Sequence, residues 1–322
     1  PALTMLSPLG RSMMRHTRSL LREYQRDGLL HSNLAWRNVH VKSATLRDSE
    51  HRIYSELQDY CRQLAQKIGA NMQESRQRAA VGFYLSFLRQ RFSSSFRALN
   101  ESLKRRIQKI DRTLERQAAN EAFWHNGEDL EELPDEDKES LILKNRSTSD
   151  LVWEKGKVRD LLDDLGMLPE VPDKSNKLLN VIQERRYGQG RVRQVVVFTR
   201  YTDTLNHLYE LLTRRLPSCP VGVFTGDGGC VRWGDAPSFR RYDRTAIKRF
   251  FLSQEIDILL CTDAAAQGLN LQSADLLINF DLPWNPMLLE QRIGRIHRIG
   301  QKRSVYIFNM ALKDTVEENV LE

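Results

Sequence analysis

Hydrophobic positions follow two different periods along the chain. Over residues 11–30 and 50–118, apolar side chains recur at helical spacing among many arginines, which predicts long helices at His51–Ile68 and Ala79–Leu114. From about residue 150, short apolar runs alternate with stretches of helical period. This change predicts a mostly α-helical region followed by an α/β domain.

The second part reads as an ordered series of strands and helices. The predicted strands are Val192–Thr199, Val221–Thr225, Ile256–Thr262, Leu276–Phe280 and Val305–Asn309. The predicted helices are Asp203–Arg215, Arg241–Leu252 and Pro286–Ile299. Because the strands are short, apolar and rich in β-branched residues, we expect a parallel sheet that helices cover on both faces.

Charge is distributed unevenly over the 322 residues, whose net charge is +7. Residues 1–120 carry +12, residues 121–140 carry −8 and the remainder carries +3. The acidic stretch 128–139 contains Pro134 and has no periodic apolar face, which predicts a linker; an acidic mimic of nucleic acid is the alternative. We therefore expect a helical region at 1–125, a linker at 126–150 and an α/β domain at 151–322.

Two classes of protein are excluded by the composition. No apolar run approaches the ~20 residues of a membrane span, so we expect no membrane partner. The four cysteines form no C-x-x-C pair and no metal-ligand spacing with the seven histidines, which predicts reduced thiols in a cytoplasmic protein and no metal site. The chain begins at Pro1 and ends inside an amphipathic pattern, so we expect a piece of a longer protein.

A basic segment, QRIGRIHRIGQ at 291–301, carries the strongest chemical signal. On a helix, Gln291, Arg295 and Arg298 fall on one line, while Arg292 points about 100° away from Gln291. Guanidinium groups match phosphate oxygens in geometry and stay charged at physiological pH. The line therefore predicts a phosphate-facing surface, with a solvated basic helix face as the alternative. Arg292 lies off this line, so its substitution by alanine should affect a phosphate-dependent activity less than that of Arg298.

A second segment places polar and small residues at the end of a buried strand. The apolar run Ile258–Cys261 leads into Thr262 and Asp263, and the sequence AAAQGLNL follows. In open α/β sheets, ligands bind at the carboxyl ends of the strands, and small residues there allow a close approach. These residues are therefore predicted to line the same site as the arginines.

Together these motifs resemble the C-terminal RecA-like lobe of bacterial Swi/Snf-type superfamily-two helicases, which are ATP-driven DNA translocases. TDAAAQGLNLQSAD (262–275) is similar to helicase motif V, and FDLPWNPMLLEQRIGRIHRIGQ (280–301) to the stretch ending in motif VI. VVVFTRYTDTL (195–205) is similar to motif IV, and DKSNKL (173–178) to the segment that opens the lobe. The resemblance is fainter over 1–120, where 13–21 is similar to the exit from the first lobe and 50–60 and 88–106 to the helices joining the lobes.

The resemblance implies roles for individual residues. Arg295 and Arg298 would be catalytic arginine fingers on the phosphates of ATP. The residues expected on the nucleotide side are Gln291, Gly294, Asp263 and Gly268. The residues expected to contact the sugar-phosphate backbone of duplex DNA, without reading its sequence, are Thr199, Arg200, Thr262 and Asn270. The first turn of the helix at 203–215 is also a candidate phosphate site, and an ordinary helix cap is the alternative.

Two departures from the family pattern limit what the chain can do. It contains no G-x-x-x-x-G-K-[ST] loop and no acidic box for Mg²⁺, so ATP with Mg²⁺ would need the N-terminal ATPase lobe of the same protein as a partner. The glycine-rich stretch 226–239 is longer than the usual turn and is interpreted as a surface insertion or a DNA-facing or partner-facing loop. A helicase-like module without catalysis is the alternative function, and the bacterial resemblance implies a cytoplasmic, nucleoid-associated protein.

Overall fold

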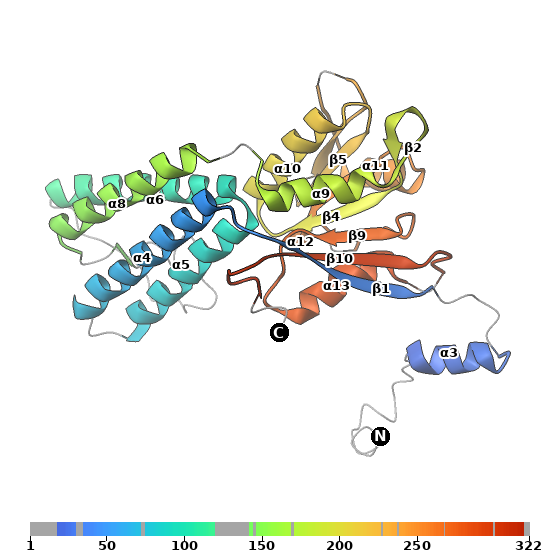
Figure 1. Cartoon of the computed structure of the whole chain (residues 1–322), viewed down its shortest axis with the longest axis horizontal. Coiled ribbons are helices and arrows are strands. Elements are labelled where there is room, and N and C mark those ends of the chain that lie inside the picture. Colours follow the sequence, from blue (N-terminus) through green and yellow to red (C-terminus); the bar gives the residue numbers. More distant parts are fainter. Residues whose placement is uncertain are drawn as a thin grey trace, which may run out of the picture.

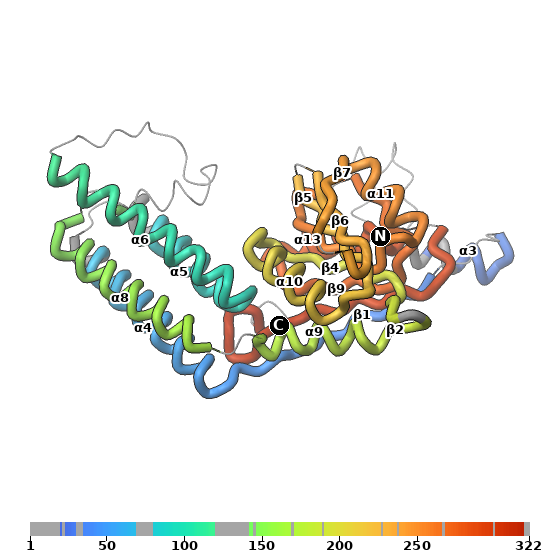
Figure 2. Tube along the Cα trace, turned by 90° about the horizontal axis from the view of Figure 1, so that it is seen from above, coloured from blue at the N-terminus to red at the C-terminus, as the bar shows by residue number. Residues whose placement is uncertain are grey.

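The computed structural model describes residues 18–29, 35–71, 75–119, 142–143, 146–168, 171–226, 228–236, 238–266, 268–298 and 300–318. It has a helical unit beside a sheet unit (Figures 1 and 2). The expected acidic stretch 128–139 and most of the segment 13–21 lie outside the described residues. No helix in these ranges combines the length and the apolar character needed to cross a membrane.

Four helices lie side by side in the helical unit: α4 (Asp48–Asn71), α5 (Ser75–Ser94), α6 (Phe96–Ala118) and α8 (Thr148–Gly166), with α3 (Arg18–Arg26) apart from them. The single helix predicted over Ala79–Leu114 is wrong, because the chain breaks at Ser95. Ser95 has extended backbone angles, and its hydroxyl accepts a hydrogen bond from the Ala98 amide at 3.1 Å. It is the N-cap that starts α6.

The helical unit contains a buried ionic cluster within its apolar core. The carboxylate of Glu154 on α8 accepts hydrogen bonds from Arg106 of α6 and from Arg146, and it also accepts one from the Tyr60 hydroxyl of α4 at 2.9 Å. Burial would raise the pKa of Glu154, but the two guanidinium charges outweigh burial and lower it. The ionised carboxylate therefore holds three helices together.

The sheet has eight strands in the order β1-β10-β9-β4-β8-β5-β6-β7. Their bounds are β1 (Arg37–Ala44), β4 (Val195–Thr199), β5 (Val221–Thr225), β6 (Gly228–Arg232), β7 (Arg240–Tyr242), β8 (Ile258–Thr262), β9 (Leu276–Asn279) and β10 (Val305–Leu312). A separate ribbon pairs β2 (Arg186–Tyr187) with β3 (Arg191–Val192). The first six strands of this order, from β1 through β10, β9, β4 and β8 to β5, pair in parallel. The central strands β9, β4 and β8 are fully buried, which confirms the predicted α/β fold.

Helices cover both faces of the sheet because alternate side chains of each strand point to opposite sides. Val195 and Val197 pack in one core with α9 (Asp173–Gln183) and α10 (Thr202–Arg215). Val196 and Phe198 pack in another with α11 (Arg244–Leu252) and α13 (Pro286–Ile296). The short helix α12 (Asp263–Ala266) follows directly after β8.

Both edges of the sheet differ from the sequence prediction. Strand β1 was not predicted, and it pairs with β10 along its whole length. The stretch 226–239 supplies β6, which with β7 forms an antiparallel ribbon at the other edge. A Cβ atom at Gly229 would lie 2.0 Å from the Val223 carbonyl oxygen, so this close strand contact requires glycine. Helix α11 begins only after Asp243, its N-cap.

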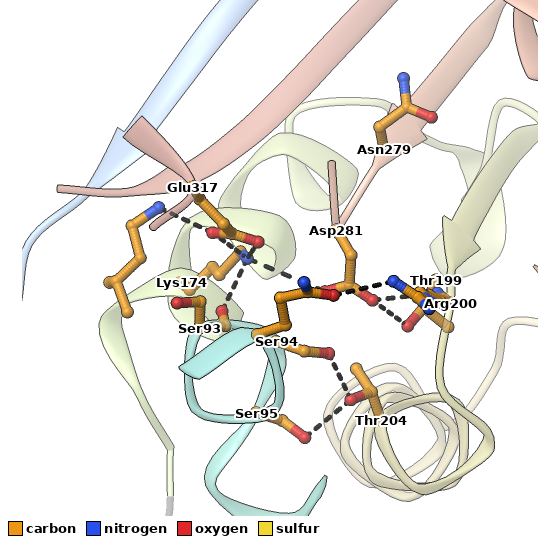
Figure 3. A network of polar contacts seen from close by, with 12 residues as sticks. Ser93, Ser94, Ser95, Lys174, Thr199, Arg200, Thr204, Asn279, Asp281 and Glu317 are labelled. Carbon is orange, nitrogen blue, oxygen red and sulfur yellow. Dashed lines mark hydrogen bonds and ion pairs between the residues drawn. The ribbon is translucent and has the colours of Figure 1, made fainter. Parts of the chain in front are cut away.

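Polar contacts join the two units where α5 ends (Figure 3). The Lys174 ammonium, at the start of α9, donates to the Ser93 carbonyl at 2.9 Å and to both carboxylate oxygens of Glu317 at 2.8 and 2.7 Å. Asp281 Oδ1 lies 3.9 Å from the same ammonium. Burial, and then Asp281, raise the pKa of Glu317 to about 7 against the opposing charge of Lys174.

The raised pKa predicts a pH dependence of stability. Because the folded state holds the Glu317 proton more tightly than the unfolded chain, the contribution of this group is fully present below pH ~4.5 and is lost as pH rises through about 7. We expect the free energy of unfolding of the native chain, relative to Glu317→Gln, to fall between pH 5 and pH 7.5. Urea unfolding of both proteins measures it, and a difference that rises with pH would contradict the assignment.

Candidate functional site

Three central strands end at the same edge of the sheet. Thr199 of β4 is in register with Thr262 of β8, and Phe198 with Asn279 of β9. Because these strands are parallel, the segments that follow them lie together. Motifs IV, V and the start of the stretch leading to motif VI therefore meet at one edge, as the sequence predicted.

Arg292 is the side chain that joins these segments. It is 2% exposed, and it donates to both carboxylate oxygens of Asp263 at 2.5 and 2.7 Å. It also donates to Asn279 Oδ1 at 3.1 Å and to the Asp281 carbonyl at 2.8 Å. The sequence singles out Arg292→Ala as the milder change for ATP turnover, but the structure places this guanidinium in a buried socket rather than facing solvent, so its removal would disturb the fold. Sequence could have found it only by pairing Arg292 with Asp263 across the sheet edge.

The two predicted finger arginines have a different environment. Arg295 is half-buried and Arg298 is exposed, and neither contacts a carboxylate in the described part of the chain. Burial, and then the Arg298 charge, lower the pKa of Arg295. Helix α13 ends at Ile296, so the predicted helix to Ile299 is too long and Arg298 lies beyond it, with its Nε donating to the Gly294 carbonyl at 2.7 Å. The structure thus keeps two like charges near each other, with no acidic partner among the described residues.

Gln301 anchors the end of this motif. Its side-chain amide donates to the carbonyls of Gln272, Ala274 and Ile296 at 2.9, 3.2 and 3.1 Å, and it is 3% exposed. The Leu271 amide also donates to the Arg295 carbonyl at 3.0 Å. The segment after α12 and the end of α13 are therefore fixed to each other, a role for Gln301 that the sequence did not indicate.

The remaining predicted nucleotide-side residues lie around this helix and loop. Gln291 is exposed, and Gly294 has open space where a Cβ would lie. Gly268 has φ +78°, which an L side chain rarely adopts, so its backbone conformation requires glycine. Asp263 is 27% exposed in its side chain, although Arg292 occupies both of its oxygens. Its carboxylate is a structural partner in this state.

The predicted DNA-facing residues divide into two groups. Thr199 is fully buried and donates to the Asp281 carboxylate, and Thr262 is 9% exposed, so the structure does not present these hydroxyls at the surface. Arg200 is exposed, and it donates to Gln90 Oε1 of the helical unit at 2.8 Å. Asn270 is half-buried and accepts from the Gln272 amide at 3.2 Å. The structure thus leaves Arg200 and Asn270 accessible.

The start of α10 lies against the helical unit. Asp203 in its first turn pairs with Arg91 at 2.8 Å and Arg105 at 2.9 Å, both from the helical unit. The Thr204 hydroxyl hydrogen-bonds to those of Ser94 and Ser95 at 2.6 and 2.8 Å. The helical unit therefore covers this helix end, and the arginine-rich helices use part of their charge for this contact rather than for nucleic acid.

Within the described ranges, no group of three or more His, Cys, Asp or Glu side chains could hold a metal ion. All four cysteines are free thiols, and burial raises the pKa of three of them strongly: Cys61 to about 12, Cys219 to about 11, and Cys261 higher still.

The contrast between two arginines of one motif gives a stability prediction. We expect Arg292→Ala to cost about 1–3 kcal/mol in the free energy of unfolding, because it leaves the half-buried Asp263 carboxylate and the oxygens of Asn279 and Asp281 without their donor. We expect Arg298→Ala to change it by less than about 0.5 kcal/mol, because the side chain is exposed. Urea denaturation of both variants measures this, and equal costs would refute the assignment.

Comparison with known proteins is consistent with this geometry. Residues 173–300 match the family model of the helicase conserved C-terminal domain. Over 130 residues, the chain is 43% identical to YqhH of Bacillus subtilis, described as an uncharacterized ATP-dependent helicase, covering 40% of this chain and 21% of that protein. Over 75 residues it is 47% identical to the RNA polymerase-associated protein RapA of Vibrio campbellii, covering 23% of this chain and 8% of RapA. These matches thus cover about a fifth of the length of YqhH and less than a tenth of the length of RapA.

Two solved structures share the fold. The C-terminal part of the Fun30 ATPase domain aligns with a TM-score of 0.50 and 18% identity, covering 90% of this chain and 89% of that one. The Hef helicase domain of Pyrococcus furiosus aligns with a TM-score of 0.54 and 12% identity, covering 95% and 64%. Residues 173–300 of the chain thus match the helicase conserved C-terminal domain, and the chain shares its fold with these two helicase structures.

Proposed function

We propose that this chain is the C-terminal half of an ATP-dependent DNA translocase, and that Arg295 and Arg298 stabilise charge on the phosphates of ATP bound against an N-terminal ATPase lobe. The observation that carries the proposal is the pair itself: two neighbouring guanidinium groups without a carboxylate among the described residues. Such a pair is unfavourable in isolation and becomes favourable when a polyanion binds. The third arginine, Arg292, is fully paired and cannot take this role.

The surrounding contacts support this division of roles. Arg292 fixes α13 to Asp263 at the start of motif V, and Gln301 fixes the end of motif V to the end of α13. A rigid base of this kind holds a charged group where negative charge grows during phosphoryl transfer, which avoids reorganisation at that moment. We expect ATP and Mg²⁺ to contact mainly the N-terminal lobe, with the two arginines completing the site from this side.

The ATPase prediction concerns a protein that carries both lobes. There, Arg298→Ala should lower kcat by about 10³-fold or more, as expected for a finger arginine, with a smaller effect on KM because the group acts mainly on the transition state. Steady-state ATP hydrolysis with duplex DNA measures both constants. Lys302→Ala, which removes another exposed cation four residues away, is the matched control and should retain near-normal kcat.

Two outcomes would contradict the assignment. One is an Arg298→Ala variant with normal kcat, and the other is a Lys302→Ala variant with the same loss. The chain of 322 residues alone, which contains no phosphate-binding loop motif, should show no DNA-stimulated ATP hydrolysis.

The DNA prediction concerns the accessible part of motif IV. We expect weak, sequence-independent duplex binding whose affinity falls steeply with salt, because the contacts are to phosphate. Arg200→Ala should weaken binding several-fold and reduce the salt slope by about 1. Fluorescence anisotropy at several salt concentrations measures this. Arg159→Ala, on an exposed face of α8, is the control, and an equal effect of both variants would assign binding to general charge instead.

A further inference from the structure

The Lys174 side chain stands where three distant segments meet. Its ammonium donates to the Ser93 carbonyl at the end of α5 and to Glu317 near the end of the chain, and it faces Asp281 after β9 at 3.9 Å (Figure 3). It is 4% exposed, and it also lies 4.9 Å from the centre of the Phe280 ring. This ammonium therefore links the helical unit to the functional edge of the sheet.

Asp281 contacts residues of two motifs, motif IV and motif VI. Its Oδ2 accepts hydrogen bonds from the Thr199 hydroxyl and from the Arg200 amide, the latter at 3.0 Å. Its backbone carbonyl accepts from Arg292 at 2.8 Å, and Arg292 holds Asp263. The position of Asp281 thus determines where the backbone of motif IV lies and where Arg292, which connects motifs V and VI, is held.

The other carboxylate oxygen explains why Lys174 matters for Asp281. Asp281 Oδ1 is buried and accepts no hydrogen bond from the residues that the structure describes, and among these residues the Lys174 ammonium, at 3.9 Å, is the cation that faces it. Asp281 is 4% exposed and Glu317 6% exposed, and the two carboxylates share this one ammonium. A buried carboxylate without a compensating cation moves toward water or takes up a proton. Removal of the ammonium therefore favours displacement of Asp281.

We propose that Lys174 is a positioning residue that acts through Asp281. By holding Asp281 in place, it fixes the Arg200 backbone and the Arg292 socket, and so orients the nucleotide-facing and DNA-facing side chains. Through the Ser93 carbonyl it also connects this arrangement to the end of α5. The effect on turnover rests on the proposed function. The effect on the local structure does not, because it follows from contacts within this chain.

The test on this chain is hydrogen exchange of individual amides. In Lys174→Met, the Arg200 amide, which bonds directly to Asp281, should exchange at least tenfold faster, and the amides of α13 should also lose protection. Lys177→Met is the matched control on the same helix, where the ammonium donates to the Ser43 carbonyl at 2.6 Å and pairs with Asp173 at 3.0 Å. It should leave the Arg200 amide unchanged.

A second variant separates positioning from general stability. Glu317→Gln perturbs the same cluster but leaves Lys174 facing Asp281, so the Arg200 amide should stay protected. Lys174→Arg keeps the positive charge and should restore most of the protection lost in Lys174→Met. The proposal is overturned if Glu317→Gln exposes the Arg200 amide as much as Lys174→Met does, or if Lys174→Met leaves this amide protected. If Lys174→Met does not fold, Glu317→Gln and Lys174→Arg still test the role of Lys174. An Arg200 amide that stays protected in both variants supports the proposal, and one that exchanges fast in either variant overturns it.

In a protein with both lobes, Lys174→Met should lower kcat for DNA-stimulated ATP hydrolysis at least tenfold with little change in KM, and Lys174→Arg should recover most of it. A residue needed only for folding would lower the active fraction and leave the turnover of each folded molecule unchanged, so that result would overturn the proposal. If the two-lobe protein hydrolyses no ATP at all, the proposed function fails, while the exchange results still decide the role of Lys174.

Discussion

The buried guanidinium of Arg292 is the contact on which the functional edge depends. The strands β4, β8 and β9 bring three loops to one edge, but parallel pairing alone fixes only their starting points. Arg292 supplies the cross-connection, because its planar fork satisfies a carboxylate, a side-chain amide oxygen and a backbone carbonyl at once. The cost of burying its charge is met only when all three loops are in place, so the arrangement of the edge is cooperative.

The same requirement explains how arginines that look alike in the sequence come to differ. Arg292, Arg295 and Arg298 occur within seven residues, and the helical spacing alone groups the last two with Gln291. In the structure, Arg292 lies inward and is neutralised, while Arg295 and Arg298 remain without a counter-charge among the described residues. One motif thus contains both a buried arginine that anchors the sheet edge and two arginines that the described residues leave without a counter-charge.

Much of the fold was predictable because the strands and helices of the sheet unit have strong local signals. The strand at Val221–Thr225 was placed correctly, and α10 to within one residue. The break at Ser95, the strand β1 and the burial of Thr199 were not, since each depends on a partner far away in the sequence. Arg292 was misjudged for the same reason: a helical wheel shows the angle between side chains but not which acidic residue the fold brings opposite.

The pairing of β1 with β10 has a topological consequence. The helical unit leaves the sheet after β1 and returns to it at α9, and the two connection points are neighbours, because the Thr45 amide donates to the Asp173 carboxylate at 3.0 Å. The four helices are therefore an insertion between two neighbouring positions of the sheet unit, connected to it by two chain segments that lie side by side. A chain that joined Thr45 directly to Asp173 and left out the four helices would keep every strand pairing of the described sheet.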